Sequence, residues 1–276
     1  MGTAGYTIKK SSGAEDIYDR DGLRSLHNQD FIRDPAFAQA YARGVEAAGD
    51  LDWHWRVHIG LWAAYSASNL DGDFVECGVN RGFLSSAIMR YLDWDKTGKT
   101  FYLLDTFAGL DERFVSEKEI DSGTLAKNET NLATGHYVNG ADSVIQNFSD
   151  WKNVEIIAGS IPETLSEIGA RQIAYLHLDM NCAPPEVAAF EYLWERLVNG
   201  AFVLLDDYAY QGYQEQKYAM DKAAAAKNHK IVSLPTGQGL LIKYGETGGN
   251  ATLTDRAKLT VERSVNVAFP PVATSR

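Results

Sequence analysis

Residues 230–243, KIVSLPTGQGLLIK, contain two short apolar runs, 230–234 and 239–243, with only four residues between them. A parallel crossover needs a dozen or more residues, so these runs must pair as an antiparallel hairpin. Upstream, five β-rich runs alternate with helical segments, which predicts parallel strands covered by helices on both faces. Those runs are 73–77, 100–105, 153–158, 173–179 and 201–206. The predicted fold class is α/β: a doubly wound, Rossmann-like, seven-stranded sheet, mostly parallel, with an antiparallel last strand.

Helices are expected between the strands, where apolar residues recur at helical spacing. Their predicted ranges are 82–92, 162–169, 185–198 (stopped by Gly200) and 212–227. Two further helices, from Asp34-Pro35 to Gly49 and from about Asp52 to Asn69, should form a cap before the sheet. Residues 1–30 show no sustained period and are expected to be a loose arm. The predicted organisation is an arm with a helical cap (1–70), a ligand-binding domain (71–244) and a C-terminal tail (245–276).

Composition narrows the class of partner. The chain has 276 residues, a net charge of −11 and no basic run, so a nucleic-acid partner is not expected. No apolar run approaches the roughly 20 residues that span a bilayer, and the N-terminus does not resemble a secretory signal. We therefore expect a soluble, cytoplasmic protein with a small-molecule partner. Cys77 and Cys182 are expected to be small core residues.

The stretch DFVECGVNRG, residues 73–82, leaves the first strand and enters a helix. In doubly wound folds, ligands bind beyond the carboxyl ends of the strands, so Gly78, Asn80 and Gly82 are candidate cofactor-binding residues. Glu76 would repel a pyrophosphate at this turn, and it suits a cation. S-adenosylmethionine carries an ammonium and a sulfonium and no phosphate, which makes it the expected cofactor. The alternative for Glu76 is a structural role in holding the amides of the loop.

Two further strand ends predict contacts to a nucleoside. Asp105 ends the run 100–105 and would accept hydrogen bonds from ribose hydroxyls, with Thr106 beside it. This role suits NAD equally well, and a turn or cap role is the alternative. Gly159 and Ser160 follow the run 153–158, and Ser160 with Glu163 forms a capping-box pattern for the next helix. Gly159 and Ser160 are also expected to border the adenine.

Three carboxylates follow two neighbouring strands. Asp179 ends one run, and Asp206 and Asp207 end the next. Adjacent strands lie about 4.8 Å apart, so these acids should meet at one edge and repel one another unless a cation shares them. Neither segment contains Lys or Arg, and an all-oxygen cluster suits Mg²⁺ or another hard divalent cation. We predict a metal site here that would stabilise the alkoxide of a hydroxyl acceptor. Loop capping by Asp206 and Asp207 is the alternative.

Together these motifs resemble the macrocin O-methyltransferase family, metal-dependent enzymes that methylate sugar hydroxyls on natural products. The likeness covers roughly residues 70–244 and rests on DFVECGVNRG (73–82), LLDTFAGLDE (103–112), AGSIPETL (158–165), LHLDMN (176–181) and LLDDYAY (204–210). It implies a class I methyltransferase fold and a homo-oligomer. It also implies S-adenosylmethionine contacts at Glu76, Gly78 and Asp105, and Mg²⁺ ligands at Asp179, Asp206 and Asp207.

One residue departs from the family pattern. Members often carry an acidic residue, able to act as base, two positions after the first metal aspartate, and this chain has Asn181 there. An amide cannot accept a proton at neutral pH. His136, in the segment TGHY between the second and third strands, is the predicted substitute base because the pKa of histidine suits the task. The alternative is a solvent-exposed loop histidine without a catalytic role.

The predicted activity is methyl transfer from S-adenosylmethionine to a hydroxyl of a sugar or glycosylated small molecule, with His136 and Asp179 as catalytic residues. The helical cap and the long connection 106–150 are expected to cover the acceptor. The alternatives are a catechol or phenol O-methyltransferase, a nicotinamide-dependent oxidoreductase, and a non-catalytic protein of the same fold that binds a nucleoside ligand. Glu76 and the terminal hairpin both oppose the oxidoreductase.

Overall fold

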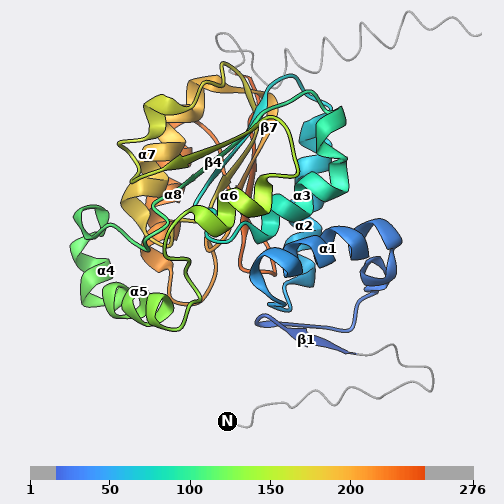
Figure 1. Ribbon diagram of the computed structural model, residues 1–276. Helices are drawn as coiled ribbons and strands as arrows, with labels where there is room; N and C mark the ends of the chain where they lie inside the picture. The colour runs from blue at the N-terminus through green and yellow to red at the C-terminus, as the bar shows by residue number, and fades with distance from the viewer. Residues whose placement is uncertain (1–16, 246–276) are drawn as a thin grey trace, which may run out of the picture. The chain divides into compact units, whose positions relative to one another are not determined.

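A seven-stranded sheet forms the centre of the computed structural model, which describes residues 17–245. The strand order is β5-β4-β3-β6-β7-β9-β8. Figure 1 shows the sheet, with β4 and β7 labelled, between its covering helices. The strands are β3 (Asp73–Cys77), β4 (Phe101–Asp105), β5 (Val154–Ala158), β6 (Ile173–Leu178), β7 (Leu197–Leu205), β8 (Val232–Ser233) and β9 (Gly239–Ile242). Strands β3 to β7 are mutually parallel, and β9 pairs antiparallel with both β7 and β8. The predicted fold class is confirmed.

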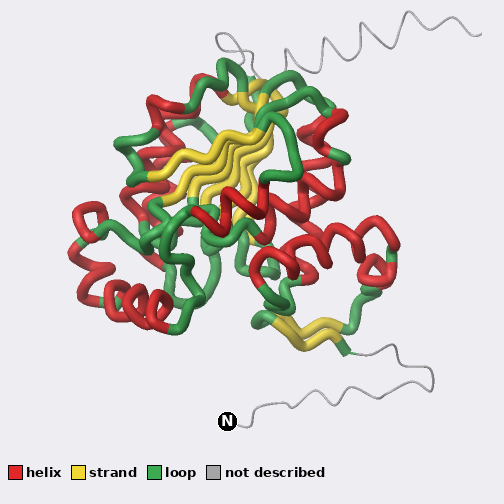
Figure 2. The backbone as a smooth tube through the Cα atoms, viewed as in Figure 1, coloured by secondary structure: helices red, strands yellow, loops and turns green. Residues whose placement is uncertain are grey.

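Helices cover both faces of this sheet (Figure 2). α1 (Pro35–Ala48), α2 (His54–Ser68) and α3 (Phe83–Leu92) pack on one face, and α7 (Ala183–Leu193) and α8 (Gln214–Ala226) pack on the other. Alternate side chains of each strand point to opposite faces. Phe74 therefore joins the core under α1 to α3, while Val75 joins the core under α7 and α8. The predicted cap helices thus share the core of the sheet.

The long connection between β4 and β5 folds into short helices: η3 (Glu112–Phe114), α4 (Glu117–Asp121), α5 (Thr124–Ala133) and α6 (Asp142–Phe148). Ser116 and Glu119 form a capping box at the start of α4. The second carboxylate oxygen of Glu119 accepts a hydrogen bond from the Ala183 amide at 2.7 Å. Glu119 therefore ties this insertion, residues 106–150, to the first turn of α7. A short helix, η2 (Trp94–Lys96), precedes β4.

The prediction of a loose arm over residues 1–30 is wrong for the part that the structure describes. Residues 17–30 include a hairpin of β1 (Tyr18–Arg20) and β2 (Leu23–Ser25), followed by η1 (Asp30–Arg33). Tyr18 is buried, and its hydroxyl donates to the Asp52 carbonyl oxygen at 3.0 Å. Its ring also meets those of His54 and Trp55. These contacts fasten the hairpin to the start of α2, which the local sequence pattern did not reveal.

One predicted helix is also wrong, and another ends earlier than predicted. Residues 162–169 hold only η4 (Leu165–Glu167), because the residues of the expected capping box bind the insertion instead. The Ser160 hydroxyl donates to Asp111 at 2.5 Å, and Glu163 pairs with Arg113 at 2.9 Å. The helix expected over 185–198 ends at Leu193 and continues as η5 (Trp194–Arg196), because β7 already begins at Leu197. Gly200 lies inside β7 and does not stop a helix.

In the described range 17–245, no helix is long and apolar enough to cross a membrane. The predicted tail, 245–276, lies outside the described residues except for Gly245. The predicted boundary at residue 70 stays a prediction.

Gly78→Ala tests the close approach of two strand ends. Gly78 has φ +92°, and a Cβ there would lie 1.8 Å from the Asp179 carbonyl oxygen. Left-handed backbone alone costs an alanine about 1–2 kcal/mol. We expect Gly78→Ala to lose clearly more than that in urea denaturation. The matched control is Gly123→Ala, at φ +90°, where no atom of residues 17–245 lies within 4 Å of the added Cβ. Equal losses for the two variants would contradict the contact.

Candidate active site

A cavity of about 320 Å³ lies at the carboxyl ends of the parallel strands, where this fold class binds its ligands. Most of the predicted site residues line it. They are Gly78, Asn80, Asp105, Thr106, His136, Gly159, Ser160, Asp179, Asp206 and Asp207. Residues from β3, β4, β5, β6, β7 and the insertion therefore converge on one cavity, as the sequence predicted.

Two predicted cofactor residues lie outside this lining. Gly82 packs against the Phe148 ring, and a Cβ added at Gly82 would lie 2.6 Å from atoms of that ring. The structure therefore shows a packing role for Gly82. Glu76 lines a smaller adjoining cavity of about 50 Å³. Its first carboxylate oxygen lies 2.8 Å from Nδ1 of His177. Its second oxygen is buried and has no hydrogen-bond partner among residues 17–245. An unpaired buried carboxylate oxygen is costly and calls for an explanation.

Asp105 is held in place by the backbone. Its carboxylate accepts hydrogen bonds from the amides of Asn80 and Phe107, each at 2.7 Å. Burial raises the pKa of the Asp105 carboxyl, and these amides act against that rise. The Asn80 side chain bonds the insertion at His136 and Val138, at 3.0 and 2.9 Å. Asp105 thus has the turn role considered as its alternative, while it still faces the cavity.

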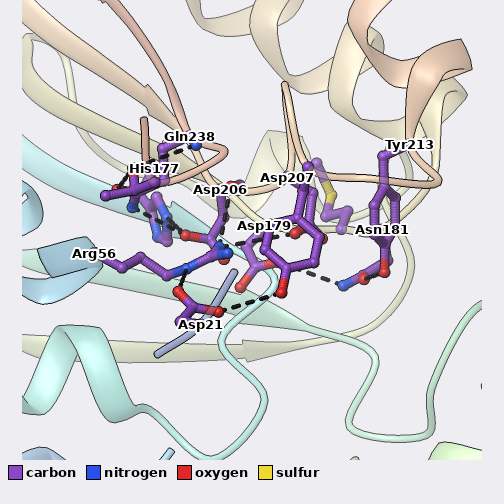
Figure 3. Close-up of polar contacts among 12 residues, drawn as sticks. Asp21, Arg56, His177, Asp179, Asn181, Asp206, Asp207, Tyr213 and Gln238 are labelled. Atoms are coloured by element: carbon purple, nitrogen blue, oxygen red, sulfur yellow. Dashed lines mark hydrogen bonds and ion pairs between the residues drawn. The ribbon is translucent and has the colours of Figure 1, made fainter. Parts of the chain in front are cut away.

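Arg56 of α2 lies among the acids (Figure 3). Its Nη1 pairs with the Asp206 carboxylate and lies 3.8 Å from that of Asp207, and its Nε bonds Asp21 at 3.2 Å. The guanidinium also lies over the Tyr210 ring, 5.0 Å from its centroid. Burial lowers the pKa of Arg56, but the carboxylates outweigh it and raise that pKa above its ordinary value. The expectation that the acidic edge contains no protein cation is therefore wrong.

His177 joins the two acidic positions. It lies between Glu76 and Asp206, with Nε2 3.8 Å from an Asp206 oxygen, which is too long for a hydrogen bond. Burial lowers the pKa of His177, but the carboxylates of Asp206 and Glu76 raise it to about 10. Histidine is then a cation at neutral pH. Its burial and contacts suit a residue that orients the carboxylates on either side of it.

Asp206 is fully engaged, whereas its neighbours are not. Gln238 donates to one of its oxygens at 3.1 Å, and Arg56 binds the other. Burial raises the pKa of Asp206, but Arg56 and His177 reverse this and hold it below the usual range. Burial and the neighbouring Asp206 raise the pKa of Asp207 to about 7 and that of Asp179 well above its usual value. The edge thus has fewer cations than carboxylates.

The predicted three-carboxylate metal site is not preformed. Across residues 17–245, no group of three or more His, Cys, Asp or Glu side chains has the geometry of a metal site. Asp206 is unavailable as a ligand while Arg56 and Gln238 hold it. Asp179 and Asp207 remain, and Mg²⁺ is commonly held by one or two carboxylates together with water or substrate oxygens. The donor chemistry therefore fits a divalent ion at two carboxylates, not at three.

The predicted base His136 and the amide residue Asn181 have different surroundings. His136 lines the cavity, and burial together with Lys127 and Arg81 lowers its pKa. Its imidazole is therefore neutral at pH 7 and able to accept a proton. Asn181 is hydrogen-bonded on both sides: its oxygen accepts from the Tyr213 hydroxyl at 2.8 Å, and its nitrogen donates to Asp179 at 3.3 Å.

Sequence reasoning missed several cavity residues that come from distant segments. They are Asp21, Arg56, Lys127, Tyr210 and Tyr213. Asp21 sits in the β1–β2 turn at φ +49°, and its short side chain reaches Arg56. The Asp-Gly pair at 21–22 is a hairpin signal that could have located this turn. No local signal marks Arg56, because its partners lie 35 and 150 residues away along the chain.

The sheet order and the cavity at the strand ends define a class I methyltransferase fold. A model of the macrocin O-methyltransferase family matches residues 61–232, which is more than half of the chain. The chain therefore belongs to the macrocin O-methyltransferase family.

Individual relatives agree with this assignment. A Streptomyces olivaceus protein, 8-demethyl-8-(2,3-dimethoxy-α-L-rhamnosyl)-tetracenomycin-C 4′-O-methyltransferase, is 28% identical over 151 residues. The match covers 52% of this chain and 55% of the relative, so the chain spans about half the length of that protein. The solved O-methyltransferase NovP has a TM-score of 0.61 at 18% identity, covering 74% of this chain and 88% of NovP. The calicheamicin methyltransferase CalS11 has a TM-score of 0.54 at 17% identity, covering 80% and 98%. These two structures support the fold.

Arg56→Met tests the buried ion pair. Removing one partner of such a pair leaves a buried charge uncompensated and costs about 3–5 kcal/mol. Arg56 lowers the folded-state pKa of Asp206, so its stabilisation is present above the unfolded pKa and is lost as pH falls through the folded one. In the variant, Asp206 would instead resist ionisation. We therefore expect the loss in free energy of unfolding to be largest near pH 7 and smaller near about pH 4.5.

Arg43→Met is the control, measured by the same urea denaturation at both pH values. Arg43 is also mostly buried, but its hydrogen bonds, at 2.6 Å each, go to the neutral residue Asn147, and its ion pair with Glu46 is long, at 3.8 Å, and involves an exposed carboxylate. Its loss should depend little on pH. The same pH dependence in both variants would argue against a special ion pair at Arg56.

Proposed function

We propose that this protein is an S-adenosylmethionine-dependent O-methyltransferase that acts on a hydroxyl of a sugar or glycosylated small molecule. The observation that carries the proposal is the unpaired, buried carboxylate oxygen of Glu76 beside a cavity edged with acids. A pyrophosphate would be repelled there, whereas the ammonium of S-adenosylmethionine would be attracted. The family and the rhamnosyl group in the name of the Streptomyces olivaceus relative support a sugar acceptor.

The cofactor would lie along the ends of β3, β4 and β5. Asp105 would accept hydrogen bonds from the ribose, as its remaining lone pairs permit after the two amides that it binds. Gly159 and Ser160 would border the adenine, and Gly78 leaves room for the methionine part. Asn80 and Thr106 complete the cofactor side of the cavity.

The reaction would proceed by direct displacement. The acceptor oxygen forms a bond to the methyl carbon, the bond from that carbon to the sulfonium breaks, and neutral S-adenosylhomocysteine is released. The acceptor proton goes to the imidazole of His136, whose lowered pKa leaves it unprotonated at pH 7. Because the methyl donor is already activated, most of the acceleration would come from holding the reacting atoms in contact and in line.

A divalent cation is part of the proposal in a revised form. Asp179 and Asp207 would hold it, and Asp206 would stay with Arg56. The support is the excess of carboxylates over cations at this edge and the oxygen-only donor set. When bound, such an ion would orient the acceptor and stabilise its developing alkoxide. Asp179, as a ligand beside the acceptor, keeps the catalytic role predicted from the sequence.

Homo-oligomer formation and a cytoplasmic location stay predictions. A catechol or phenol acceptor is the second candidate, since it would use the same cofactor and ion. Nothing in the cavity favours it over a sugar.

The function is tested by binding and turnover together. We expect calorimetry to show binding of S-adenosylhomocysteine and none of NAD, and Glu76→Gln to weaken the former about tenfold, because a neutral amide does not attract the ammonium. Methyl transfer to methyl α-L-rhamnopyranoside, followed by mass spectrometry, should exceed transfer to catechol. Tight NAD binding would overturn the cofactor, and preferential catechol methylation would overturn the acceptor.

The ion is tested by titrating Mg²⁺ into the complex with S-adenosylhomocysteine. We expect Asp207→Asn to weaken Mg²⁺ binding at least tenfold. Asp111→Asn should leave it within about twofold, because Asp111 lines the same cavity but is paired with Arg113. Excess chelator should reduce methyl transfer. Equal Mg²⁺ affinity in both variants, with turnover unaffected by chelator, would remove the ion from the proposal.

A further inference from the structure

A chain of hydrogen bonds runs from the insertion to the acidic edge. Lys127 of α5 donates to the Tyr213 hydroxyl, and its ammonium lies 4.2 Å from the centroid of the Tyr213 ring. That hydroxyl donates to the Asn181 side-chain oxygen at 2.8 Å, and the Asn181 nitrogen donates to Asp179 at 3.3 Å. Figure 3 shows Tyr213, Asn181 and Asp179 aligned at one side of the acidic cluster.

The direction of this chain is fixed by chemistry. A lysine ammonium only donates, and the Asp179 carboxylate only accepts when it is ionised, as it would be when it holds a cation. The Tyr213 hydrogen must therefore point to the amide oxygen, and the amide NH₂ must point to Asp179. Every donor in the chain points from the cation to the anion, and hydrogen bonds in such a series strengthen one another.

The hydrogen-bond chain joins elements that are far apart in the sequence. Lys127 lies in the insertion, Tyr213 immediately precedes α8, and Asn181 lies between β6 and α7. All four members line the large cavity. Within residues 17–245, Lys127 is paired with no carboxylate, so the phenol of Tyr213 is what holds its ammonium.

We infer that Asn181, Tyr213 and Lys127 are positioning residues that aim the Asp179 carboxylate at the acceptor and make that aim depend on the docking of α5. The inference rests on the proposed function. It gives the amide at position 181 a role that an acid would not fill: aspartate would still accept from Tyr213, but it has no hydrogen to donate to Asp179. It would also place a second negative charge beside the first. Asn181 is thus a working part of this site, not merely a missing base.

The first test needs no acceptor. Hydrogen–deuterium exchange of residues 124–133 is measured on the full chain with S-adenosylhomocysteine bound. Tyr213→Phe removes only the hydroxyl and should raise exchange in this segment at least about threefold, since α5 loses its tie to the site. Lys127→Met should do the same, and Lys127→Arg, which keeps a donor, should restore most of the protection. Unchanged exchange in Tyr213→Phe overturns the inference.

Another lysine–tyrosine pair in the protein offers a matched control. Lys217 donates to the Tyr208 hydroxyl at 2.7 Å and lies 4.0 Å from the centroid of that ring. Tyr208 donates onward to Asp221, and neither Tyr208 nor Lys217 lines the cavity. Tyr208→Phe therefore removes an equivalent hydroxyl with no link to Asp179. It should leave exchange in 124–133 and the turnover number unchanged.

Asn181→Asp decides the role of the amide. If position 181 had only lost a base, aspartate would raise kcat for methyl α-L-rhamnopyranoside. We expect kcat to fall at least tenfold, with affinity for S-adenosylhomocysteine within twofold of the original protein. An Asn181→Asp variant at least as fast as the original overturns the inference. If the original protein transferred no methyl group but exchange still changed in Tyr213→Phe, the result would count against the proposed function and not against the hydrogen-bond chain.

Discussion

The buried ion pair between Arg56 and Asp206 holds the acidic side of the cavity together. Through the same guanidinium, α2 contacts the end of β7 and the hairpin turn at Asp21. The N-terminal hairpin and the helical cap are therefore fixed to the sheet at the point where the chemistry is proposed. A cation so completely surrounded cannot leave without exposing several buried carboxylates to one another.

That pair also sets the charge of the site. One guanidinium and His177 face Glu76, Asp21, Asp179, Asp206 and Asp207. The protein thus supplies part of the positive charge that the acids require and leaves the rest to ligands. Because Arg56 binds Asp206 and His177 binds Glu76, the remaining demand falls at two places: the free oxygen of Glu76, and Asp179 with Asp207. Those are the places assigned to the cofactor and to the divalent ion.

What the sequence could predict follows from how local each feature is. Parallel strands end at one edge, so an acid at the end of each run was enough to bring Asp105, Asp179, Asp206 and Asp207 to one cavity. The helix over 162–169 failed because Ser160 and Glu163, a valid capping pattern, bind Asp111 and Arg113 across the chain instead. Arg56 was missed because its partners are also distant: nothing near it in the sequence indicates a partner at the end of β7. The local sequence pattern predicts the strands and the acids at their ends. The cation that pairs with those acids is brought to them only by tertiary packing.

This division separates the two halves of the site. The proposed cofactor side is built by short turns after β3, β4 and β5, with backbone amides holding Asp105, so its geometry is fixed by the sheet itself. The proposed acceptor side is closed by side chains from the hairpin, α2 and α5, which reach the acids through one to three polar contacts. We expect changes in those three segments to affect the proposed acceptor side more than the strand ends, because none of the three belongs to the seven-stranded sheet. Asn181 lies where the two sides meet. It follows β6 in the sheet, and its hydrogen bond with Tyr213 connects it to α5. A substitution there should therefore affect the acceptor side first, even though the residue belongs by sequence to a strand-end motif of the framework.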